Sequence, residues 1–592
     1  MSGVSEHVIV LDGDTLADRE QIGNKGASVA RMLGLGLPVP PAFALPIEEC
    51  RRYHAAGGRL DDKVWAAVLE GVAELESRTG RRLGDPQAPL LVSVRSGAAV
   101  SMPGMMDTIL NLGMTEAVRE GLAALSGDAG FARSTHVRFC HEFGHTVLGA
   151  DIDDPGDDAT PDVVCAEIEE DTGEQVPGDP YDQLRAAIHA VFESWSSRRA
   201  IAYRKHWGIP QDGGTAVVVQ AMVFGNLGER SGTGVLFTRD PLSGAPEPYG
   251  EWLPGGQGED VVSGSHDPLP LEALREQMPE VHDELLAAAA LLERTNGDVQ
   301  DIEFTVEGGR LYLLQTRSAK RAPLAAVRTA VDLATEGAIE PAQAIARVSA
   351  EQLASVLAPR LARETADVAE VLVRGVAACP GVASGRVVAD ADAAEAAADA
   401  GEDVVLARPT TSPEDVSGMI AARAVVTERG GSTSHAAVVT RALGRPSVVG
   451  VGEGATGAWA DREVTVDGSA GVVYAGRLAT EEVGEDDVPG LAELVAWARE
   501  LSPTAVVDEA EEVVDLDEAG LVLDPEDAPD AGAIAQRLAG APAARGSVLA
   551  TAEGARAVAR SGVPAVVRLP GQHEAILLLR LAQEASRSEE ER

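Results

Sequence analysis

Short β-branched runs alternate with helical patterns along most of the chain, and this alternation constrains the fold more than any other feature. Gly- and Pro-rich turns separate the runs, as is typical of mixed α/β domains. The runs of the N-terminal half fall at 7–11, 89–94, 215–224, 234–238, 301–306 and 311–316. Because domains average about 150 residues, a chain of 592 residues predicts an α/β multidomain protein.

Changes in pattern divide the chain into four regions. Residues 1–322 hold the runs above and an acidic insertion at 151–182, which contains no Lys or Arg and which we interpret as a surface loop. Residues 323–368 predict a helical linker. A Gly- and Val-rich strand pattern follows at 369–480. Residues 481–592 predict a short α/β tail, in which GSVLATAEGARAVARSGVPAVVRL fits strand, helix, strand.

Charge and composition exclude several classes of function. With 49 basic and 94 acidic residues, the net charge of −45 argues against a nucleic-acid partner. No apolar run approaches the ~20 residues of a membrane span, and the N-terminus lacks the apolar core of a signal peptide. The four cysteines show no metal or disulfide spacing. We expect a soluble, cytoplasmic protein.

Residues 423–450 carry the most informative chemical pattern. RAVVT predicts a strand, and Gly430 and Gly431 permit a tight turn. The segment from Ala436 to Leu443 predicts a helix that ends at Gly444. This region is therefore predicted to be a strand, a glycine turn and a helix.

His435 falls in the first turn of that helix, where Thr433 or Ser434 can act as the N-cap. The N–H groups and the dipole of a helix N-terminus stabilise an anion. Neutral imidazole, with a pKa of about 6.5, is a competent nucleophile near neutral pH. The pattern fits a phosphorylated histidine, but a capping histidine without chemistry fits the spacing equally well.

Two neighbouring strand runs carry polar side chains at alternate positions. Asp301 and Glu303 share one face of the first strand, and Gln315 and Arg317 share one face of the second. Carboxylate, amide and guanidinium groups so placed can hold Mg²⁺ and a triphosphate. The open alternative is a salt-bridge cluster on a surface hairpin.

Two further cations are suited to phosphate. Lys25 lies in a Gly-flanked turn, and Arg95 ends a strand run and can contact phosphoryl oxygens with two N–H groups. The chain contains no GxxxxGK[ST] pattern, which argues against a P-loop. His141 and His145 satisfy H-E-x-x-H, but Gly144 weakens the helix and no third ligand follows, so we expect an ordinary helix.

The segment GGSTSHAAVVTRALG resembles the phosphohistidine loop of the phosphoenolpyruvate-utilising enzymes of the pyruvate, phosphate dikinase type. TSPEDVSGM and CPGVASGRVV resemble the swivelling domain of that family. The first 320 residues resemble its nucleotide-binding domain in sequence segments such as VSVRSGAAVSMPGMMDTILNLG, SGTGVLFTRDPLSG and QDIEFTVEGGRLYLLQTR. The resemblance implies an ATP-grasp domain, a helical linker and a swivelling β/β/α phosphohistidine domain.

The resemblance also implies roles for single residues. His435 is then the catalytic histidine, within a loop formed by Gly430, Gly431, Thr433 and Ser434. The implied nucleotide-binding residues are Lys25, Arg95, Asp301, Glu303, Gln315 and Arg317, with Mg²⁺ held by Glu303 and Gln315. Arg138, Glu259 and Asp260 match positions for a phosphate acceptor, although Gly255-Gly256 replaces the usual Asn-Ala before Gln257.

The implied reaction has two stages. ATP transfers its β,γ-phosphates to His435, inorganic phosphate removes the γ group as pyrophosphate, AMP leaves, and the phosphohistidine then serves an acceptor. A (β/α)₈ acceptor barrel takes about 250 residues, which 481–592 cannot supply, so pyruvate would need a barrel in a separate protein. The alternatives are an enzyme that uses water, like phosphoenolpyruvate synthase, another small-molecule phosphotransferase, and a nucleotide-binding regulator without turnover. The resemblance also allows a homodimer.

Overall fold

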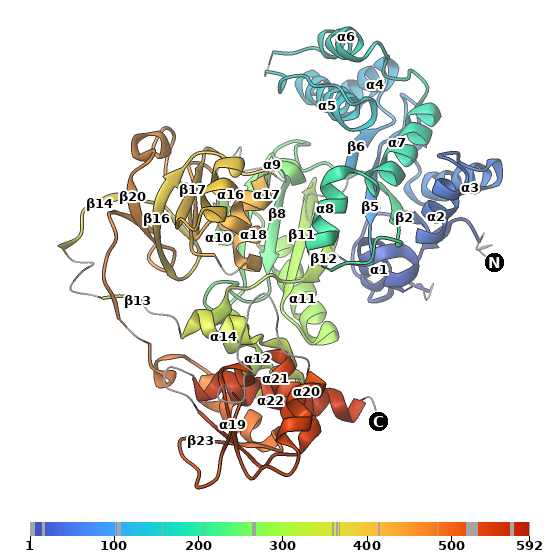
Figure 1. The fold of residues 1–592 in the computed structure, drawn as a ribbon. Helices are drawn as coiled ribbons and strands as arrows, with labels where there is room; N and C mark the ends of the chain where they lie inside the picture. Colours follow the sequence, from blue (N-terminus) through green and yellow to red (C-terminus); the bar gives the residue numbers. More distant parts are fainter. Residues whose placement is uncertain are drawn as a thin grey trace.

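The structure is a computed structural model that falls into three bodies, one of them the tail with its linker helices (Figure 1). It describes residues 6–14, 18–100, 102, 108–156, 158–206, 208–262, 268–357, 360–362, 365, 368–412, 415–443, 445–481, 483–516, 531–568 and 573–590. Strands and helices alternate through each body. The predicted α/β multidomain organisation is confirmed.

Two antiparallel sheets build the N-terminal body, and six of their ten strands overlap the six predicted runs. The first has the order β1-β2-β7-β5-β6, with the bounds Ile9–Leu11, Ala42–Leu45, Ala216–Ala221, Val92–Gly97 and Thr108–Leu112. The second has the order β10-β9-β8-β11-β12, with the bounds Leu269–Pro270, Tyr249–Pro254, Gly232–Phe237, Gln300–Glu307 and Arg310–Ser318. Helices α1 (Arg19–Gly34) and α11 (Pro279–Asn296) contribute to a common core that reaches both sheets.

A helical layer covers the first sheet. Its members are α2 (Ile47–Ala55), α3 (Asp62–Thr79), α4 (Glu116–Ser126), α5 (Ala129–Phe143) and α7 (Pro180–Ser194), and α6 (Pro161–Thr172) packs on α5. The acidic insertion is therefore more than a surface loop, because α6 lies within it and buries Val164 and Ile168. These two apolar residues, four positions apart, give the acidic segment one buried face. Helix α5 ends before His145, which lies in the π-helical turn Gly144–Leu148.

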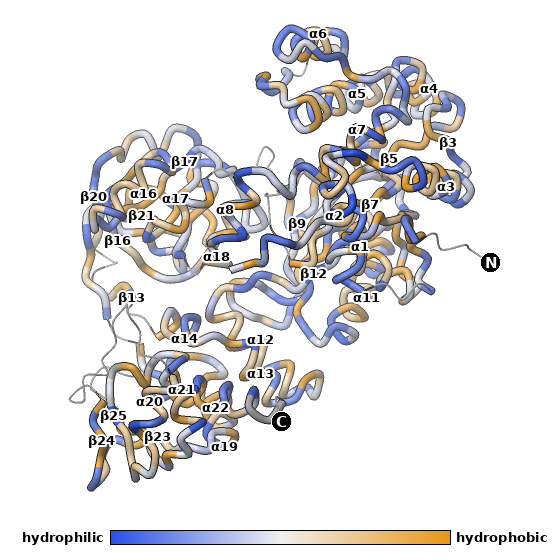
Figure 2. Tube along the Cα trace, turned by 45° about the vertical axis from the view of Figure 1, so that its right-hand side comes forward, coloured by the Kyte–Doolittle hydropathy of each residue, from blue (hydrophilic) through white to orange (hydrophobic). Residues whose placement is uncertain are grey.

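The linker is helical as predicted and shares a core with the tail. Helices α12 (Pro323–Thr335), α13 (Pro341–Arg347) and α14 (Ala350–Val356) pack with α19 (Leu491–Leu501) and α22 (Glu574–Glu590). Figure 2 shows α12, α13 and α14 next to the tail from a second direction. The linker and the tail thus form one packed unit, which the sequence did not indicate.

The tail contains a parallel sheet of the order β23-β26-β25-β24, with the bounds Ala505–Val507, Ala565–Val567, Ala544–Arg545 and Val514–Asp515. Helices α20 (Ala531–Leu538) and α21 (Ala552–Ser561) pack on it. The predicted strand at GSVLA is wrong. The chain leaves β25 at Gly546, whose φ is 154° and ψ 154°, and forms the 3₁₀ turn Ser547–Ala550.

The third body is a mixed eight-stranded sheet. Its order is β14-β21-β20-β16-β17-β18-β19-β15, with the bounds Val371–Arg374, Val472–Ala475, Glu463–Asp467, Val382–Val388, Val404–Arg408, Ala424–Thr427, Ser447–Val449 and Val376–Cys379. Strands β16, β17, β18 and β19 run parallel to one another, whereas β20 and β15 pair antiparallel with the two ends of this group. The accompanying helices are α16 (Ala391–Asp399), α17 (Val416–Ala421) and α18 (His435–Leu443).

The two connections of this third body run side by side. Strand β13 (Arg360–Leu361) precedes the body and pairs antiparallel with β22 (Thr480–Glu481), which follows it. Both attachments therefore lie at one place. None of the described helices has the length and apolar character of a membrane span.

Candidate active site

The segment that carries His435 folds as a strand, a turn and a helix, as predicted. Strand β18 ends at Thr427, Gly430 adopts a φ of 109°, and α18 begins at His435. Gly444, which we expected to end the helix, lies outside the described residues. Ser434 occupies the position before the helix, but its buried hydroxyl has no hydrogen-bond partner among the described residues. The predicted capping hydrogen bond is therefore absent there.

The imidazole of His435 is held at one nitrogen. Its Nδ1 lies 3.2 Å from Oγ1 of Thr411, in the loop after β17. Its Nε2 is buried and has no partner within the described part of the chain. Burial lowers the pKa of His435, and nearby Asp415 opposes this in part. The lowered pKa favours the neutral ring at pH 7, and the lone pair lies on Nε2 when Nδ1–H donates a hydrogen bond to Thr411.

Replacing Thr411 with valine tests this orientation. The variant keeps the shape of the side chain but removes the hydroxyl that holds Nδ1. We expect phosphorylation of His435 to slow by about 5- to 10-fold, since one hydrogen bond contributes on the order of 1 kcal/mol. Rapid-quench labelling should show the change with ATP affinity intact. A rate equal to that of the wild type would contradict the positioning role.

The polar residues of the two adjacent strands come together as the alternation predicted. Glu303 of β11 lies opposite Gln315 of β12, and Asp301 lies opposite Arg317. Nε of Arg317 is 2.7 Å from Oδ2 of Asp301, which is buried. This ion pair raises the pKa of the Arg317 guanidinium and fixes it as a permanent cation.

Two further cations lie beside Glu303 and Gln315: Arg95, from the first sheet, and Lys25, from α1. Nη2 of Arg95 lies 3.5 Å from Oε2 of Glu303 and 3.3 Å from Oε1 of Gln315. Lys25 follows a break in α1 at Gly23, which has a φ of 68°. A Cβ at Gly23 would come within 1.8 Å of the carbonyl oxygen of Gly97. Glycine therefore allows the start of α1 to approach the end of β5, beside Arg95.

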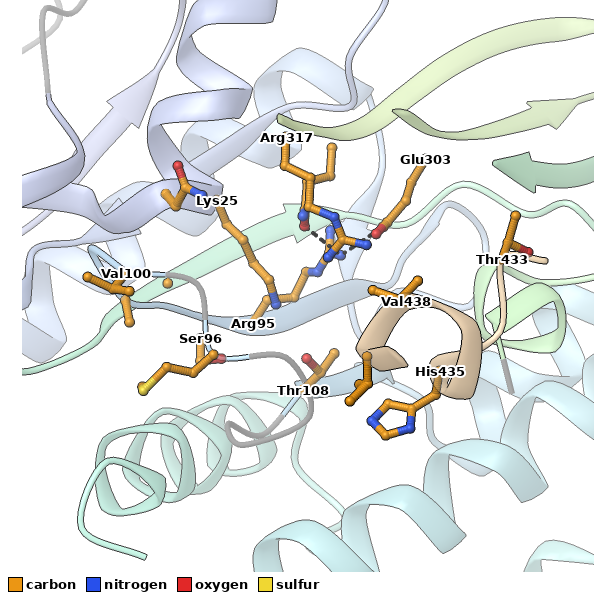
Figure 3. Close-up of a pocket in the computed structure, with 16 residues that line it drawn as sticks. Lys25, Arg95, Ser96, Val100, Thr108, Glu303, Arg317, Thr433, His435 and Val438 are labelled. Carbon is orange, nitrogen blue, oxygen red and sulfur yellow. Dashed lines mark hydrogen bonds and ion pairs between the residues drawn. The ribbon is translucent and has the colours of Figure 1, made fainter. Parts of the chain in front are cut away.

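A cavity of about 350 Å³ joins the charged group to the histidine. Its polar lining comes from both bodies and comprises Asn24, Lys25, Arg95, Ser96, Thr108, Glu303, Gln315, Arg317, Thr433 and His435. Figure 3 shows the charged side chains converging, with His435 at the start of the facing helix. The structure thus combines the two sites that the sequence placed in separate regions.

Among the ionisable groups that line this cavity, Lys25 has the largest change in pKa. Burial, reinforced by Arg95 and Arg317, lowers its pKa to about 7, although Glu303 acts in the opposite direction. A polyphosphate would supply negative charge at this point. Negative charge favours the ammonium form and raises the pKa.

Binding of ATP at pH about 8 should therefore be accompanied by uptake of close to one proton. Titration calorimetry in two buffers of different ionisation enthalpy measures this uptake. Lys25→Gln should abolish it, while Lys63→Gln, which removes a lysine on α3, should not. Equal proton uptake by the Lys25→Gln variant and the wild type would contradict the assignment.

A carboxylate of the N-terminal body holds the histidine loop in place. Glu251 of β9 accepts hydrogen bonds from Ser432, at 2.8 Å, and from Thr433. The hydroxyls of Tyr249 and Ser432 are 2.5 Å apart. Sequence reasoning missed Glu251 and Tyr249, as well as Thr411, because a strand carboxylate or a loop hydroxyl has no distinctive spacing. Thr433 is engaged by Glu251 in this arrangement.

The residues expected to serve phosphate are only partly in place. Nη1 of Arg138, on α5, lies 2.9 Å from Oδ1 of Asp260, on α9 (Gly258–Val262). Glu259 is on the same short helix, but its side chain lies outside the described part of the structure. The pair does not line the cavity around His435. The structure thus joins Arg138 to Asp260, away from the residues that line the cavity.

Mg²⁺ fits the oxygen atoms of this site. Glu303 and Gln315 offer a carboxylate and an amide oxygen from neighbouring strands, and both face the cavity. Among the described residues, no three His, Cys, Asp or Glu side chains are grouped to hold a metal ion. Since Mg²⁺ is commonly bound by one or two carboxylates together with substrate phosphates, these residues suit an ion that arrives with ATP.

Comparison with known proteins gives two domain matches. Residues 58–279 match the AMP/ATP-binding domain of pyruvate phosphate dikinase, and residues 400–471 match the mobile domain of PEP-utilising enzymes. The chain is 41% identical over 517 residues to pyruvate, phosphate dikinase of Clostridium symbiosum, covering 81% of this chain and 59% of that protein. It is 45% identical over 454 residues to pyruvate, phosphate dikinase 2 of Zea mays, covering 73% and 51%. The chain spans between about half and three fifths of the length of these relatives.

Proposed function

We propose that this chain, which matches the AMP/ATP-binding domain of pyruvate phosphate dikinase and the mobile domain of PEP-utilising enzymes, is a dikinase-type phosphotransferase with His435 as its phosphoryl carrier. The shared cavity supports this proposal, because His435, whose Nε2 has no partner among the described residues, lines it together with the cations Lys25, Arg95 and Arg317. In the proposal the N-terminal body is the ATP-grasp domain, covering residues 1–322. Residues 369–480 form the swivelling domain.

The first step is attack on ATP by His435. Nε2 bonds to the β-phosphorus, the bond from that phosphorus to the oxygen of the α-phosphate breaks, and AMP leaves with both electrons of that bond. Lys25, Arg95 and Arg317 neutralise the charge that develops on the phosphoryl oxygens. The hydroxyl oxygen of Thr411 accepts a hydrogen bond from Nδ1–H and keeps Nε2 aimed at the phosphorus. Mg²⁺ held by Glu303 and Gln315 would supply further charge neutralisation at the phosphates.

The second step uses inorganic phosphate. An oxygen of phosphate attacks the γ-phosphorus, the bridge to the β-phosphate breaks, and pyrophosphate leaves a single phosphoryl group on His435. The buried hydroxyl of Ser434 and the N-terminus of α18 are free to stabilise that group. Arg138, Asp260 and Glu259 are our candidates for phosphate binding. In this proposal the ion pair with Asp260 holds the guanidinium of Arg138 in place for phosphate.

The acceptor must be reached by undocking. Glu251 and Tyr249 release the loop, and the paired strands β13 and β22 provide one attachment about which the domain turns. We propose that the acceptor is a small molecule or a separate protein that carries it.

Labelling with ATP tests the proposal. The protein is incubated with Mg²⁺ and β-³²P-labelled ATP, with and without phosphate. We expect acid-labile label on the protein, AMP in both cases, and pyrophosphate that depends on phosphate. Release of the γ-phosphate as inorganic phosphate, without formation of pyrophosphate, would instead identify an enzyme that uses water. Binding of ATP without AMP or label would overturn the proposal in favour of a regulatory protein.

A further inference from the structure

Two cysteines on neighbouring helices place their sulfur atoms close together. Sγ of Cys165, on α6, lies 3.3 Å from Sγ of Cys140, on α5. The helices are held close at this point, since a Cβ at Gly144 would lie 2.5 Å from Cδ1 of Ile168. Formation of a disulfide, with a bond of about 2.05 Å, requires an approach of little more than ~1 Å.

The two thiols differ in their access to solvent. Cys165 is half-buried, whereas Cys140 is 1% exposed. The hydrogen bond with Cys140 lowers the pKa of Cys165, while the same contact and burial raise that of Cys140. Cys165 is thus the sulfur that ionises first and meets an oxidant, and Cys140 is the sulfur positioned to resolve it.

We propose that Cys140 and Cys165 form a reversible disulfide in response to hydroperoxides. The thiolate of Cys165 attacks the terminal oxygen of the hydroperoxide, the O–O bond breaks, and the alcohol leaves after taking up a proton. The sulfenic acid so formed is attacked by the sulfur of Cys140, and hydroxide leaves with the thiol proton as water. Both sulfur atoms are oxidised, and the hydroperoxide is reduced. A dithiol reverses the reaction.

The disulfide would act on α5. Arg138 and Cys140 are two positions apart, roughly 200° around the helix, so they lie on opposite faces. Drawing Cys140 towards α6 therefore draws Arg138 away from Asp260, its partner at 2.9 Å. If the proposed function holds, oxidation raises the KM for phosphate while leaving the phosphate-independent formation of AMP unchanged.

Peptide mapping tests the disulfide without any assay of activity. Trypsin leaves both cysteines in one peptide, residues 139–185, so digestion with trypsin and a Glu-specific protease is needed. After treatment with hydrogen peroxide and alkylation, we expect residues 139–142 to be linked to residues 143–167, and the link to disappear with dithiothreitol. Cys140→Ser and Cys165→Ser should each abolish the link. Cys50→Ser and Cys379→Ser, at buried cysteines elsewhere, should retain it.

If peroxide treatment of the folded wild-type protein gives no disulfide-linked pair of these two peptides, the proposal is overturned. The second readout compares reduced and oxidised protein, with oxidised Cys165→Ser as the control. We expect a KM for phosphate at least about threefold higher for the oxidised wild type, because the disulfide weakens the ion pair between Arg138 and Asp260. An unchanged KM would overturn the coupling to Arg138. Absence of AMP formation by the reduced protein would count against the proposed function and not against the disulfide.

Discussion

His435→Ala is expected to abolish incorporation of label from β-³²P-labelled ATP. The imidazole Nε2 is the only atom in this site that the proposed reaction uses as a nucleophile, and alanine leaves nothing to carry the phosphoryl group. Loss of a catalytic nucleophile lowers rates by more than roughly 10³-fold. Formation of AMP should fall by the same factor, because it depends on the same attack.

Two controls distinguish lost chemistry from lost folding. The variant should bind ATP with nearly the affinity of the wild type, since the cations proposed to bind phosphate, Lys25, Arg95 and Arg317, lie on other elements. His145→Ala, which alters the π-helical turn after α5, should label normally. Equal labelling of His435→Ala and the wild type would show that another residue carries the phosphoryl group. Mass spectrometry at neutral pH, where phosphohistidine survives, should locate the label on the peptide that contains His435.

Glu251→Ala is expected to slow phosphorylation of His435 by about 10- to 100-fold, because it removes the carboxylate that accepts hydrogen bonds from Ser432 and Thr433. Hydrogen bonds to a charged group contribute about 1.5–3 kcal/mol each. Their loss shifts the equilibrium between docked and undocked domains towards the undocked form, in which attack on ATP cannot occur.

The matched control is Glu247→Ala, four residues earlier and exposed. It removes an equal charge from the same region without touching the loop. Single-turnover labelling measures the rate, and calorimetry should show unchanged ATP affinity for both variants. An increase in ATP-independent transfer to an acceptor would agree with easier undocking. A Glu251→Ala variant that labels as fast as Glu247→Ala would contradict the docking role.

Local patterns were sufficient for most elements. The six strand runs, the helical linker and the strand, turn and helix around His435 each depend on neighbours in sequence, such as alternation or a glycine turn. The same alternation placed Asp301 and Glu303 opposite Arg317 and Gln315. Prediction failed where long-range packing decided the structure. Residues 547–550 have strand-forming character but lie in a turn, and α6 forms in an acidic segment because α5 covers its apolar face.

The sequence by itself determined which chemical groups the protein has: an imidazole at a helix start, cations suited to phosphate and oxygen ligands on paired strands. Only the tertiary structure decided that these groups share one cavity, that Glu251 and Tyr249 hold the loop, and that Cys140 faces Cys165. The reason is that these contacts join residues far apart along the chain. Spacing along a strand or a helix sets the face on which a side chain lies, and the packing of one body on another sets what that face meets.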